Sequence, residues 1–281
     1  MRGLVFFEKL EHIAGGFDRV FEAAFARCVM RLSVRHMGTI APFFRLQGKA
    51  ENGRIRFRYT APVPKIDPRR IVFEDDHLLV VIKLGNELTV AAGGNGKLPL
   101  YDFLKKVVPG LKVVHRLDFG TSGVICFAKT ADAVRKLRES QDRWTKRYRC
   151  LVAGKVVESE GVIRRPLGAR THEGKVDAFS SYKVIGAWNL ASDVEVTIET
   201  GRKHQVRQHM AMIGHPLLMD PLYGSPEKDK LFRRKFHYDR FFLHAEYLQL
   251  PHPATGKMLT LTAPLQPSYE KAVKELRERG H

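Results

Sequence analysis

The most informative stretch of this chain reads His115-Arg116-Leu117-Asp118-Phe119-Gly120-Thr121-Ser122-Gly123. Residues 111–114 before it are typical of a strand, and the apolar run 124–128 after it predicts a strand buried on both faces. The glycines between them supply the conformational freedom of a turn. If residues 114–118 are extended, Arg116 and Asp118 point to one side of the backbone. From this pattern alone, Asp118 is either a catalytic carboxylate or a solvated turn residue.

A second segment occupies residues 199–216 and reads ETGRKHQVRQHMAMIGHP. Val206, Met210 and Ile213 recur in it at helical spacing, and the glycine and proline that follow predict the end of the helix. A loop, DPLYG, comes next at residues 220–224, and the run KRYRCLV lies earlier, at residues 146–152. Taken singly, an arginine on this helix is an ordinary surface residue, and a tyrosine in a strand is more often part of a core.

Together these runs resemble the RluA-type pseudouridine synthases of RNA. The shared pattern is HRLD-x-x-TSG, then K-x-Y, then TGR-x-HQ-[apolar]-R-x-H, with IGHP and DPLYG behind it. The resemblance covers about residues 68–265, and several motifs in one order are far more specific than a single short one. One departure lies at residues 82–84, which read Ile-Lys-Leu where family members usually have Asn-Lys-Pro. The sequence therefore does not predict the structure of the loop after this strand or the substrate specificity.

The resemblance implies roles for four residues of this chain. Asp118 becomes the catalytic carboxylate of a reaction that breaks the N1–C1′ bond of a uridine, rotates the base and rejoins it through C5. Arg207 pairs with Asp118 and keeps it ionised against the effect of burial. Tyr148 packs on the target base and accepts or relays the C5 proton, while Arg116 fills the space that the flipped base leaves in the RNA. Neither a metal ion nor any other cofactor is expected, because the reaction involves no redox change and no outside nucleophile.

Further candidates fall into two groups. The RNA-binding candidates besides Arg116 are His115, Thr121, Lys146, Arg147, Arg202 and His204. The candidates for the apolar wall of the uracil pocket are Leu243 and Leu261. Two of the first group, His115 and Thr121, are expected, with Ser122, to hold their loop by hydrogen bonds rather than to perform chemistry.

The charge of the chain favours a nucleic-acid partner. Its 48 lysines and arginines outnumber its 30 aspartates and glutamates, which gives a net charge of +18 and an isoelectric point near 10.0. Such an excess points to a polyanion, most simply ribosomal or transfer RNA. Basic residues are dense at 135–149 and at 228–235, on either side of the candidate site segments, which favours a phosphate track over a solvated face.

Apolar runs and cysteines bear on the location of the protein. No run approaches the ~18 apolar residues of a membrane span, so no membrane association is expected. The three cysteines are far apart in apolar runs, which indicates free thiols and a reducing compartment. We therefore expect a cytoplasmic protein, or alternatively one in a ribosome-containing organelle such as the mitochondrion. A monomer is the default oligomeric state.

The chain is expected to contain two domains. Residues 1–66 predict a small N-terminal α/β unit, with apolar residues at helical spacing over 17–32 and an alternating strand at 54–59 after Asn52-Gly53. Many members of the family carry a small RNA-binding domain of the S4 type at this position, and the poor match here indicates a degenerate S4-like unit. Residues 61–68 contain three prolines and are the expected linker. Residues 67–281 form the predicted catalytic domain.

The order of elements favours an α+β fold. Predicted strands lie near residues 71–83, 111–117, 124–129, 147–154, 176–187, 191–199, 241–250 and 257–262. Predicted helices lie near residues 98–108, 131–142, 203–213 and 267–279. This order does not follow a βαβ rhythm. The resemblance implies a curved, mixed but largely antiparallel sheet with flanking helices and a central cleft that binds RNA.

The main hypothesis is an enzyme, an isomerase that converts specific uridines of ribosomal or transfer RNA into pseudouridine by carboxylate catalysis with base flipping. The alternative is a catalytically dispensable RNA-binding protein on the same scaffold, such as a ribosome-assembly factor on a pre-ribosomal particle. The pair of Asp118 and Arg207 argues against it, because a protein that only binds RNA has no need of a buried ion pair. A carboxylate glycosidase ranks last, because no second acidic residue is placed for the acid/base role.

Overall fold

A computed structural model describes residues 45–51, 54–60, 66–91, 98–168 and 174–279. The chain divides into two compact units, Met1–Val63 and Pro64–His281. In the first unit, β1 (Arg45–Glu51) and β2 (Arg54–Thr60) form an antiparallel pair, which confirms the strand predicted near residues 54–59. The predicted helix at 17–32, the turn at Asn52-Gly53 and most of the expected linker lie outside the described residues.

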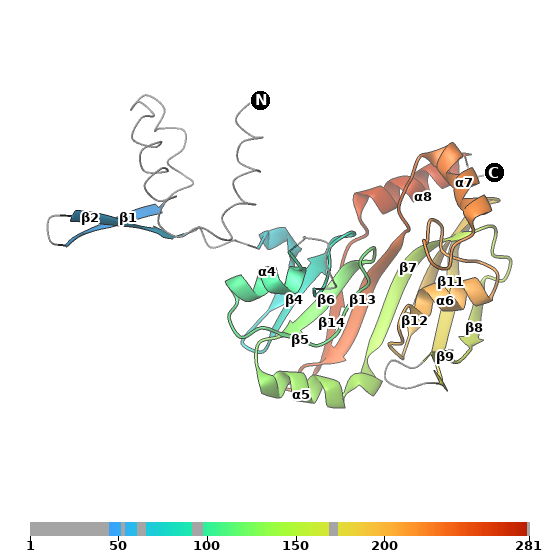
Figure 1. Ribbon diagram of the computed structural model, residues 1–281. Coiled ribbons are helices and arrows are strands. Elements are labelled where there is room, and N and C mark those ends of the chain that lie inside the picture. The colour runs from blue at the N-terminus through green and yellow to red at the C-terminus, as the bar shows by residue number, and fades with distance from the viewer. Residues whose placement is uncertain (1–44, 52–53, 61–65, 92–97, 169–173, 280–281) are drawn as a thin grey trace, which may run out of the picture. The chain divides into compact units, whose positions relative to one another are not determined.

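The second unit is built on one large sheet of ten strands (Figure 1). The strands that follow one another across it are β3 (Ile71–Glu74), β4 (Leu78–Lys83), β6 (Ser122–Ala128), β13 (Leu243–Pro251), β7 (Thr145–Ala153), β12 (Ala191–Ile198), β11 (Phe179–Ala187) and β8 (Glu160–Arg164). Off this path, β14 (Met258–Thr262) pairs with β13 and β5 (Lys112–Val113) pairs with β6. A separate two-stranded sheet joins β9 (Leu167–Gly168) to β10 (Lys175–Val176). Among the described strands, only β6 and β13 pair in parallel, so the predicted mixed, largely antiparallel sheet is confirmed.

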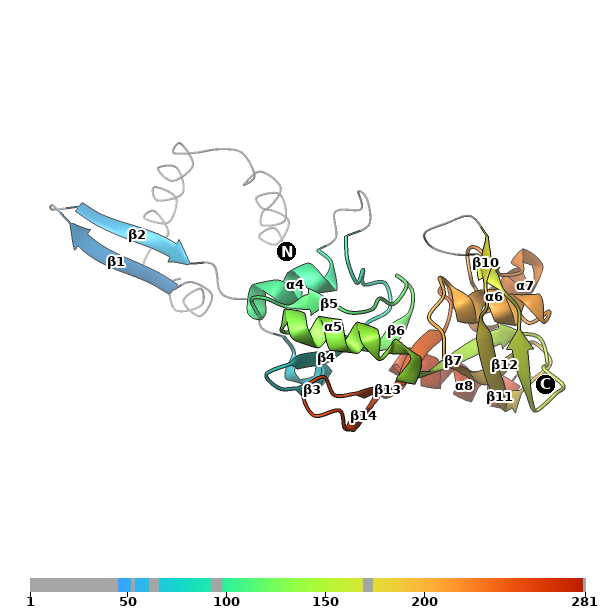
Figure 2. The ribbon, with the colours of Figure 1, turned by 90° about the horizontal axis from the view of Figure 1, so that it is seen from below.

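Helices flank this sheet on both faces (Figures 1 and 2). They are α4 (Leu100–Val107), α5 (Ala131–Glu139), α6 (Gln205–Met212), α7 (Pro226–Phe236) and α8 (Pro267–Arg279), with short 3-10 turns at Pro68–Arg70 and Gln141–Arg143. On β6, Ile125 and Phe127 pack with α4, whereas Cys126 and Ala128 pack with α5. Because successive side chains of a strand point to opposite faces, these two helices cover opposite faces of the sheet.

The same alternation on β7 places the other helices. Cys150 and Val152 pack with α6, and Leu151 and Ala153 pack with α7 and α8. Tyr148 contacts the cluster of α4 as well as that of α6, so these two helices share one face. We call it the front face, and the face covered by α5, α7 and α8 the rear face.

A glycine joins the two halves of the sheet. The parallel pairing of β6 with β13 is short, with Ser122 opposite His244 and Gly123 opposite Ala245. Gly123 has φ +117°, and a Cβ atom on it would lie 2.2 Å from the carbonyl oxygen of Ala245. Only glycine fits this conformation and this close approach. Gly123 also pairs with Lys83, and Ala245 with Tyr148, so these four residues form one row across the sheet.

Two predicted strands differ from the structure for local reasons. The predicted strand 71–83 is split by a turn, in which Asp75 Oδ1 accepts hydrogen bonds from the amides of His77 (2.8 Å) and Leu78 (2.7 Å). The predicted strand 111–117 keeps only β5. Beyond it, Leu117 bonds to a side chain instead of a strand, because Thr89 Oγ1 donates to its carbonyl oxygen (2.8 Å) and accepts from its amide (3.3 Å).

The predicted helices are confirmed as α4, α5, α6 and α8, but the sequence pattern does not predict β8, β9, β10 or α7. The basic run at 228–235 belongs to α7, whose Phe232 and Phe236 lie four residues apart and are both buried. Cys126 and Cys150 are buried free thiols, as expected. In the part of the chain that the structure describes, no helix combines the length and the hydropathy needed to cross a bilayer.

Candidate active site

Asp118 lies on a pinned loop between β5 and β6. The amide of Thr121 donates to the carbonyl oxygen of Asp118 (3.1 Å), which closes a turn, and Leu117 is buried in the cluster of α4. The side chain of Asp118 is 33% exposed. The loop therefore fixes the backbone of Asp118 and leaves its carboxylate open to a ligand.

A buried lysine supports this loop from β4. Lys83 is fully buried, and its Nζ donates to the carbonyl oxygens of Leu84 (3.0 Å), Phe119 (3.1 Å) and Thr121 (2.6 Å). Burial lowers the pKa of Lys83 to about 8, against the opposing effect of the charges of Glu87 and Asp118. Lys83, the residue of segment 82–84 that agrees with the family pattern, thus donates two hydrogen bonds to the residues that follow Asp118.

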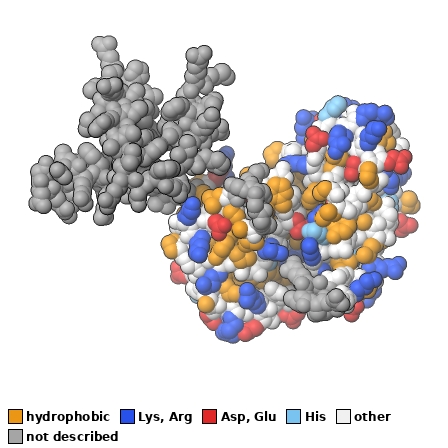
Figure 3. All heavy atoms as spheres, viewed as in Figure 1, with side chains coloured by type: hydrophobic (Ala, Val, Ile, Leu, Met, Phe, Trp, Pro, Cys, Tyr) orange, Lys and Arg blue, Asp and Glu red, His pale blue; other side chains and the backbone are white. Residues whose placement is uncertain are grey.

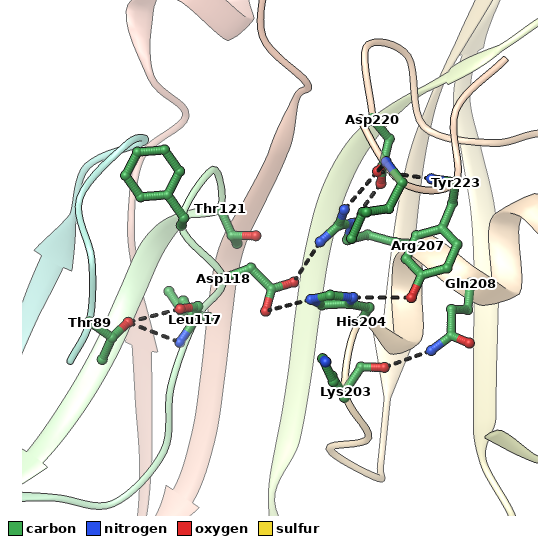
Figure 4. A network of polar contacts seen from close by, with 12 residues as sticks. Thr89, Leu117, Asp118, Thr121, Lys203, His204, Arg207, Gln208, Asp220 and Tyr223 are labelled. Atoms are coloured by element: carbon green, nitrogen blue, oxygen red, sulfur yellow. Dashed lines mark hydrogen bonds and ion pairs between the residues drawn. The ribbon is translucent and has the colours of Figure 1, made fainter. Parts of the chain in front are cut away.

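Arg207 on α6 connects Asp118 to a second aspartate (Figure 4). Its Nε and Nη2 each lie 2.6 Å from an oxygen of Asp220, and its Nη1 lies 3.4 Å from Asp118 Oδ2. The side chain of Arg207 is 5% exposed and that of Asp220 is fully buried. Burial alone would raise the pKa of Asp220, but hydrogen bonds from Arg207 and from the amides of Leu222 and Tyr223 hold that pKa below its usual value.

Aromatic rings enclose the guanidinium of Arg207. Its central carbon lies 5.2 Å from the ring centre of Tyr223 and 5.0 Å from that of Phe241. Phe241 in turn fills the space beside Gly120, where an added Cβ atom would lie 2.5 Å from the ring. These contacts, with the two bonds to Asp220, fix the direction in which Nη1 points.

The start of α6 is held by a side-chain amide. Gln205 Oε1 accepts hydrogen bonds from Thr200 Oγ1 (2.8 Å) and from the amide of Arg202 (3.1 Å), and its Nε2 donates to the carbonyl oxygen of Phe179 (2.7 Å). The residue before it, His204, is in the left-handed region with φ 54° and ψ 29°. The motif TGR-x-HQ is thus a turn that sets the direction of α6.

His204 approaches the second oxygen of Asp118. Its Nε2 lies 3.7 Å from Asp118 Oδ1, and its Nδ1 lies 3.1 Å from the hydroxyl of Tyr223 (Figure 4). Burial lowers the pKa of His204, and the positive charges of Arg207 and Lys203 lower it further against the pull of Asp118. The carboxylate of Asp118 therefore lies between a charged guanidinium and a neutral imidazole.

Tyr148 and Leu243 lie on the same part of the front face. Tyr148 is half-buried on β7, and Leu243 is buried in the cluster that Tyr148 contacts. Burial raises the pKa of Tyr148, and the negative charge of Asp118 raises it further, so the hydroxyl stays protonated. The front face thus brings together Asp118, Arg207, Tyr148 and Leu243.

Three candidates lie on the Asp118 loop. Arg116 is exposed and has no ion-pair partner among residues 66–91, 98–168 and 174–279. His115 Nε2 accepts a hydrogen bond from the amide of Cys126 (3.0 Å), and burial lowers its pKa to about 3. Thr121 is buried, and it holds the loop through its backbone rather than its hydroxyl. Of the three, Arg116 is the one whose side chain is exposed.

Two basic candidates border the site. Lys146 Nζ lies 5.1 Å from the ring centre of Trp144, and an added Cβ atom on Gly201 would lie 3.3 Å from that Nζ. Arg202 is exposed, and its Nε donates to the carbonyl oxygen of Asp177 (3.2 Å). Both residues flank the turn that precedes α6, within the reach of a bound polyanion.

Arg147 and Leu261 do not join the other candidates. Arg147 neighbours Tyr148 on β7 and points to the rear face, where its guanidinium lies 4.6 Å from the ring centre of Tyr247. Leu261 packs with Leu248 and Trp144 in the cluster of α5. Strand alternation therefore directs Arg147 away from the front face, and Leu261 lies in the cluster of α5 rather than in that of Leu243.

Three residues at the site have no role in the sequence-based assignment. Asp220 and Tyr223 belong to the DPLYG loop, which the motif match includes, and Lys83 is the middle residue of Ile-Lys-Leu, where the family usually has Asn-Lys-Pro. Their contacts are tertiary, and sequence spacing carries no signal for them. Figure 3 shows the face seen in Figure 1 hollowed between its two halves, with acidic, basic and histidine side chains together in the hollow.

Comparisons with known proteins show the family of this chain. Residues 77–212 match the family described as RNA pseudouridylate synthase. The ribosomal large subunit pseudouridine synthase D of Nitrosomonas europaea is 35% identical over 231 residues, which is 76% of this chain and 67% of that protein. Synthase C of the ribosomal large subunit of Escherichia coli K12 is 34% identical over 225 residues, 74% of this chain and 70% of that protein. The solved structure of human RNA pseudouridylate synthase domain containing 1 covers 76% of this chain and 98% of its own, with a TM-score of 0.58 and 25% identity. This chain therefore belongs to the RluA family of RNA pseudouridine synthases, and it is an isomerase that acts on RNA.

Proposed function

We propose that this enzyme converts specific uridines of ribosomal RNA into pseudouridine, with Asp118 as its catalytic carboxylate. The observation that carries the proposal is the position of that carboxylate, one third exposed on a pinned loop and 3.4 Å from the buried guanidinium of Arg207. A carboxylate must be ionised to attack carbon or to remove a proton, and a fixed guanidinium is the partner that best supports that state.

The second carboxylate of the site has no free oxygen. Asp220 is fully buried, and Arg207 binds both of its oxygens. A glycosidase needs two available carboxyl groups, one of which protonates the leaving group. An isomerisation does not, because breaking N1–C1′ and forming C5–C1′ only moves a proton from C5 to N1 within the overall balance. One free carboxylate therefore suits pseudouridine formation.

We assign the flipped base to the front face beside Asp118. The ring of Tyr148 offers a flat surface for the uracil, and Leu243 offers an apolar wall. The protonated hydroxyl of Tyr148 offers a hydrogen-bond donor near the base. Together these groups would hold the base while Asp118 acts on the nucleotide.

Arg116 is the residue that we assign to the space left by the base. It is exposed, two residues before Asp118, and unpaired within the described part of the second unit. A guanidinium plane can stack on the neighbouring bases and replace the stacking that base flipping removes. Arg116→Ala should therefore weaken RNA binding and turnover together.

The substrate follows from charge and from relatives. The net charge of +18 favours a structured polyanion. Relatives in Nitrosomonas europaea, Pseudomonas aeruginosa and Escherichia coli are named for the large ribosomal subunit. We therefore assign this enzyme to large-subunit RNA, as free RNA or within a pre-ribosomal particle. It would act as a monomer in a compartment that contains ribosomes, the bacterial cytoplasm or an organelle.

The test combines mapping in cells with a substitution. RNA from cells that lack the protein is treated with carbodiimide and read by primer extension, and complementation with the wild-type chain should restore each missing pseudouridine. Asp118→Asn should restore none of them, whereas Asp142→Asn, at an exposed aspartate away from the site, should restore them all.

Two results would contradict the proposal. If every pseudouridine persists in large-subunit RNA without the protein, and sites in transfer RNA vanish instead, the substrate assignment fails. If Asp118→Asn restores the modification, the catalytic role of Asp118 fails. Growth rescued by Asp118→Asn without modification would show that RNA binding is the required activity.

A further inference from the structure

We propose that His204 and Tyr223 act as a pair of positioning residues that orient the carboxylate of Asp118. The hydroxyl of Tyr223 donates to Nδ1 of His204, which leaves the imidazole proton on Nε2, facing Asp118 Oδ1. This inference rests on the proposed catalytic role of Asp118.

The two oxygens of Asp118 face two different donors. Oδ2 lies 3.4 Å from Nη1 of Arg207, and Oδ1 lies 3.7 Å from Nε2 of His204. Both distances exceed those of strong hydrogen bonds, as is common for catalytic groups before a substrate closes the site. With a donor facing each oxygen, shortening of both contacts on substrate binding would oppose rotation of the carboxylate about its Cβ–Cγ bond from both sides.

The backbone places His204 in this position at a cost. Its φ of 54° lies in the left-handed region, which disfavours a residue with a Cβ atom by about 1–2 kcal/mol. Glycine would fit this N-cap position more easily. The side chain of histidine is therefore present at a site where the backbone alone favours another residue, and its ring is 14% exposed between Asp118 and Tyr223.

Tyr223 is itself held in place. Its amide donates to Asp220 Oδ1 (3.2 Å), its ring lies against the guanidinium of Arg207, and its ring meets that of His204 edge-on with centres 5.7 Å apart. Asp220 thus fixes both Arg207 and the residue that bonds to His204. One buried carboxylate sets the position of both donors that face Asp118.

The protonation states allow one tautomer of His204 to serve both contacts. Burial and nearby positive charges lower the pKa of His204, so near neutral pH one ring nitrogen donates and the other accepts. Burial raises the pKa of Tyr223, so its hydroxyl keeps a proton to donate. If that proton goes to Nδ1, Nε2 carries the hydrogen. A neutral N–H orients Asp118 without cancelling the negative charge that the reaction requires.

The kinetic test uses two substitutions at position 204. In His204→Asn, which suits the left-handed backbone, kcat should fall about 10- to 100-fold while KM for an RNA transcript stays within about threefold, since the donor to Asp118 is lost. In His204→Gln, the side-chain amide nitrogen lies near the place of Nε2 and should recover part of that loss. His237→Asn is the matched control, because His237 is exposed, has φ 60° and ends α7 outside the site.

Tautomer measurement separates positioning from mere packing. In protein labelled with 15N-histidine, Nδ1 of His204 should be unprotonated and Nε2 protonated, and Tyr223→Phe should yield a mixture of tautomers and a kcat about three- to tenfold lower. Protonated Nδ1 in the wild-type chain would overturn the proposal. So would an unchanged kcat with raised KM in His204→Asn, which would instead make His204 an RNA contact.

The two proposals fail separately. If Asp118→Asn is active, the proposed function fails whatever the tautomer of His204. If Asp118→Asn is inactive and His204→Asn keeps the wild-type kcat, the catalytic role of Asp118 stands and the positioning pair is excluded.

Discussion

Arg149 and Arg207 each hold a buried aspartate through two guanidinium nitrogens, but the third partner of each network differs. Arg149 binds Asp193 through Nε and Nη2, and the hydroxyl of Tyr269 on α8 donates to the same aspartate (2.8 Å). Asp193 is 1% exposed and Tyr269 is 2% exposed, so this network is closed around its aspartate, while Arg149 itself is 14% exposed and also approaches Glu246 at 4.0 Å.

The network of Arg207 opens to solvent instead. Asp220 occupies two nitrogens of Arg207, and the third nitrogen faces Asp118, whose side chain is 33% exposed. The ion pair inside the protein keeps the guanidinium still, and the looser contact at 3.4 Å leaves Asp118 available to a substrate. The pair of Arg149 and Asp193 thus connects α8 to the sheet, whereas the pair of Arg207 and Asp220 orients a guanidinium toward Asp118.

The largest effect should come from breaking either buried pair. Asp220→Asn and Asp193→Asn should each reduce the free energy of unfolding by about 3–5 kcal/mol, because each removes the buried carboxylate that binds two nitrogens of a largely buried arginine. Asp118→Asn should reduce it by less than about 1 kcal/mol, because that carboxylate is partly solvated. Urea unfolding followed by circular dichroism measures all three. Equal losses of unfolding free energy for Asp118→Asn and Asp220→Asn would show that the partly exposed Asp118 stabilises the fold as much as the buried Asp220 does.

Replacing each arginine by lysine should separate the networks by activity. Arg207→Lys should lower kcat about 100-fold, equivalent to ~2.7 kcal/mol, because one ammonium cannot bind Asp220 with two parallel bonds and also face Asp118. Arg149→Lys should leave kcat within about threefold, since its network does not contact the site. The measurement is single-turnover release of tritium from RNA that carries uridine labelled at C5. A loss for Arg149→Lys as large as that for Arg207→Lys would show that both networks serve the reaction.

Mild acid should act on the Asp118 loop before it acts on the Arg207 pair. The pKa of His115 is about 3 in the folded chain and ordinarily 6.5, so the unfolded chain binds a proton between these values and stability falls as the pH drops below 6.5. From pH 7 to pH 5, His115 should account for a loss of about 1–2 kcal/mol, allowing for its partial exposure. The pKa of Asp220 is held below 3.8, so its pair with Arg207 persists over this range.

A substitution isolates this contribution. His115→Gln keeps an acceptor for the amide of Cys126 but does not titrate, so its stability should fall less between pH 7 and pH 5. Urea unfolding at both pH values gives the difference. An identical loss in both chains would mean that His115 does not contribute.

The smallest effects concern the two tyrosines that complete the networks. Tyr269→Phe should reduce the free energy of unfolding by about 1 kcal/mol, because Asp193 loses a buried hydrogen bond. Tyr223→Phe should reduce it by less than about 0.5 kcal/mol, because its partner His204 is not fully buried. Thermal unfolding of the two variants side by side measures the difference. A larger loss of stability for Tyr223→Phe than for Tyr269→Phe would show that the network of Arg207 stabilises the fold at least as much as that of Arg149.

The sequence predicts most of the sheet and the central pair of the site. The family resemblance implies that Asp118 pairs with Arg207 across 89 residues, and in the structure Arg207 Nη1 lies 3.4 Å from Asp118 Oδ2. Arg147 could have been excluded from the sequence alone, because it neighbours Tyr148 on a strand and must point to the other face. The position of Leu261 could not, because its register depends on β13, which is irregular between Ala245 and Tyr247.

Contacts between distant segments lie beyond sequence reasoning. The DPLYG loop is legible as a motif, but its sequence does not show that Asp220 closes on Arg207 or that Tyr223 bonds to His204. The basic composition of residues 228–235 suggests a charged patch and hides the two buried phenylalanines that make α7 a packed helix. The charge of a segment can be read from its composition, whereas the burial of its side chains depends on what the rest of the chain packs against it.

The missing side chain at position 123 has a consequence for the size of the base pocket. Gly123 follows the loop of Asp118 directly, and the row through Ala245 reaches Tyr148 two strands further on. Two strand spacings amount to about 10 Å, a length fixed by the peptide backbone and insensitive to rotamers. Any larger residue at 123 would push the strands apart and widen the distance between position 123 and Tyr148. The backbone therefore sets the width of the base pocket.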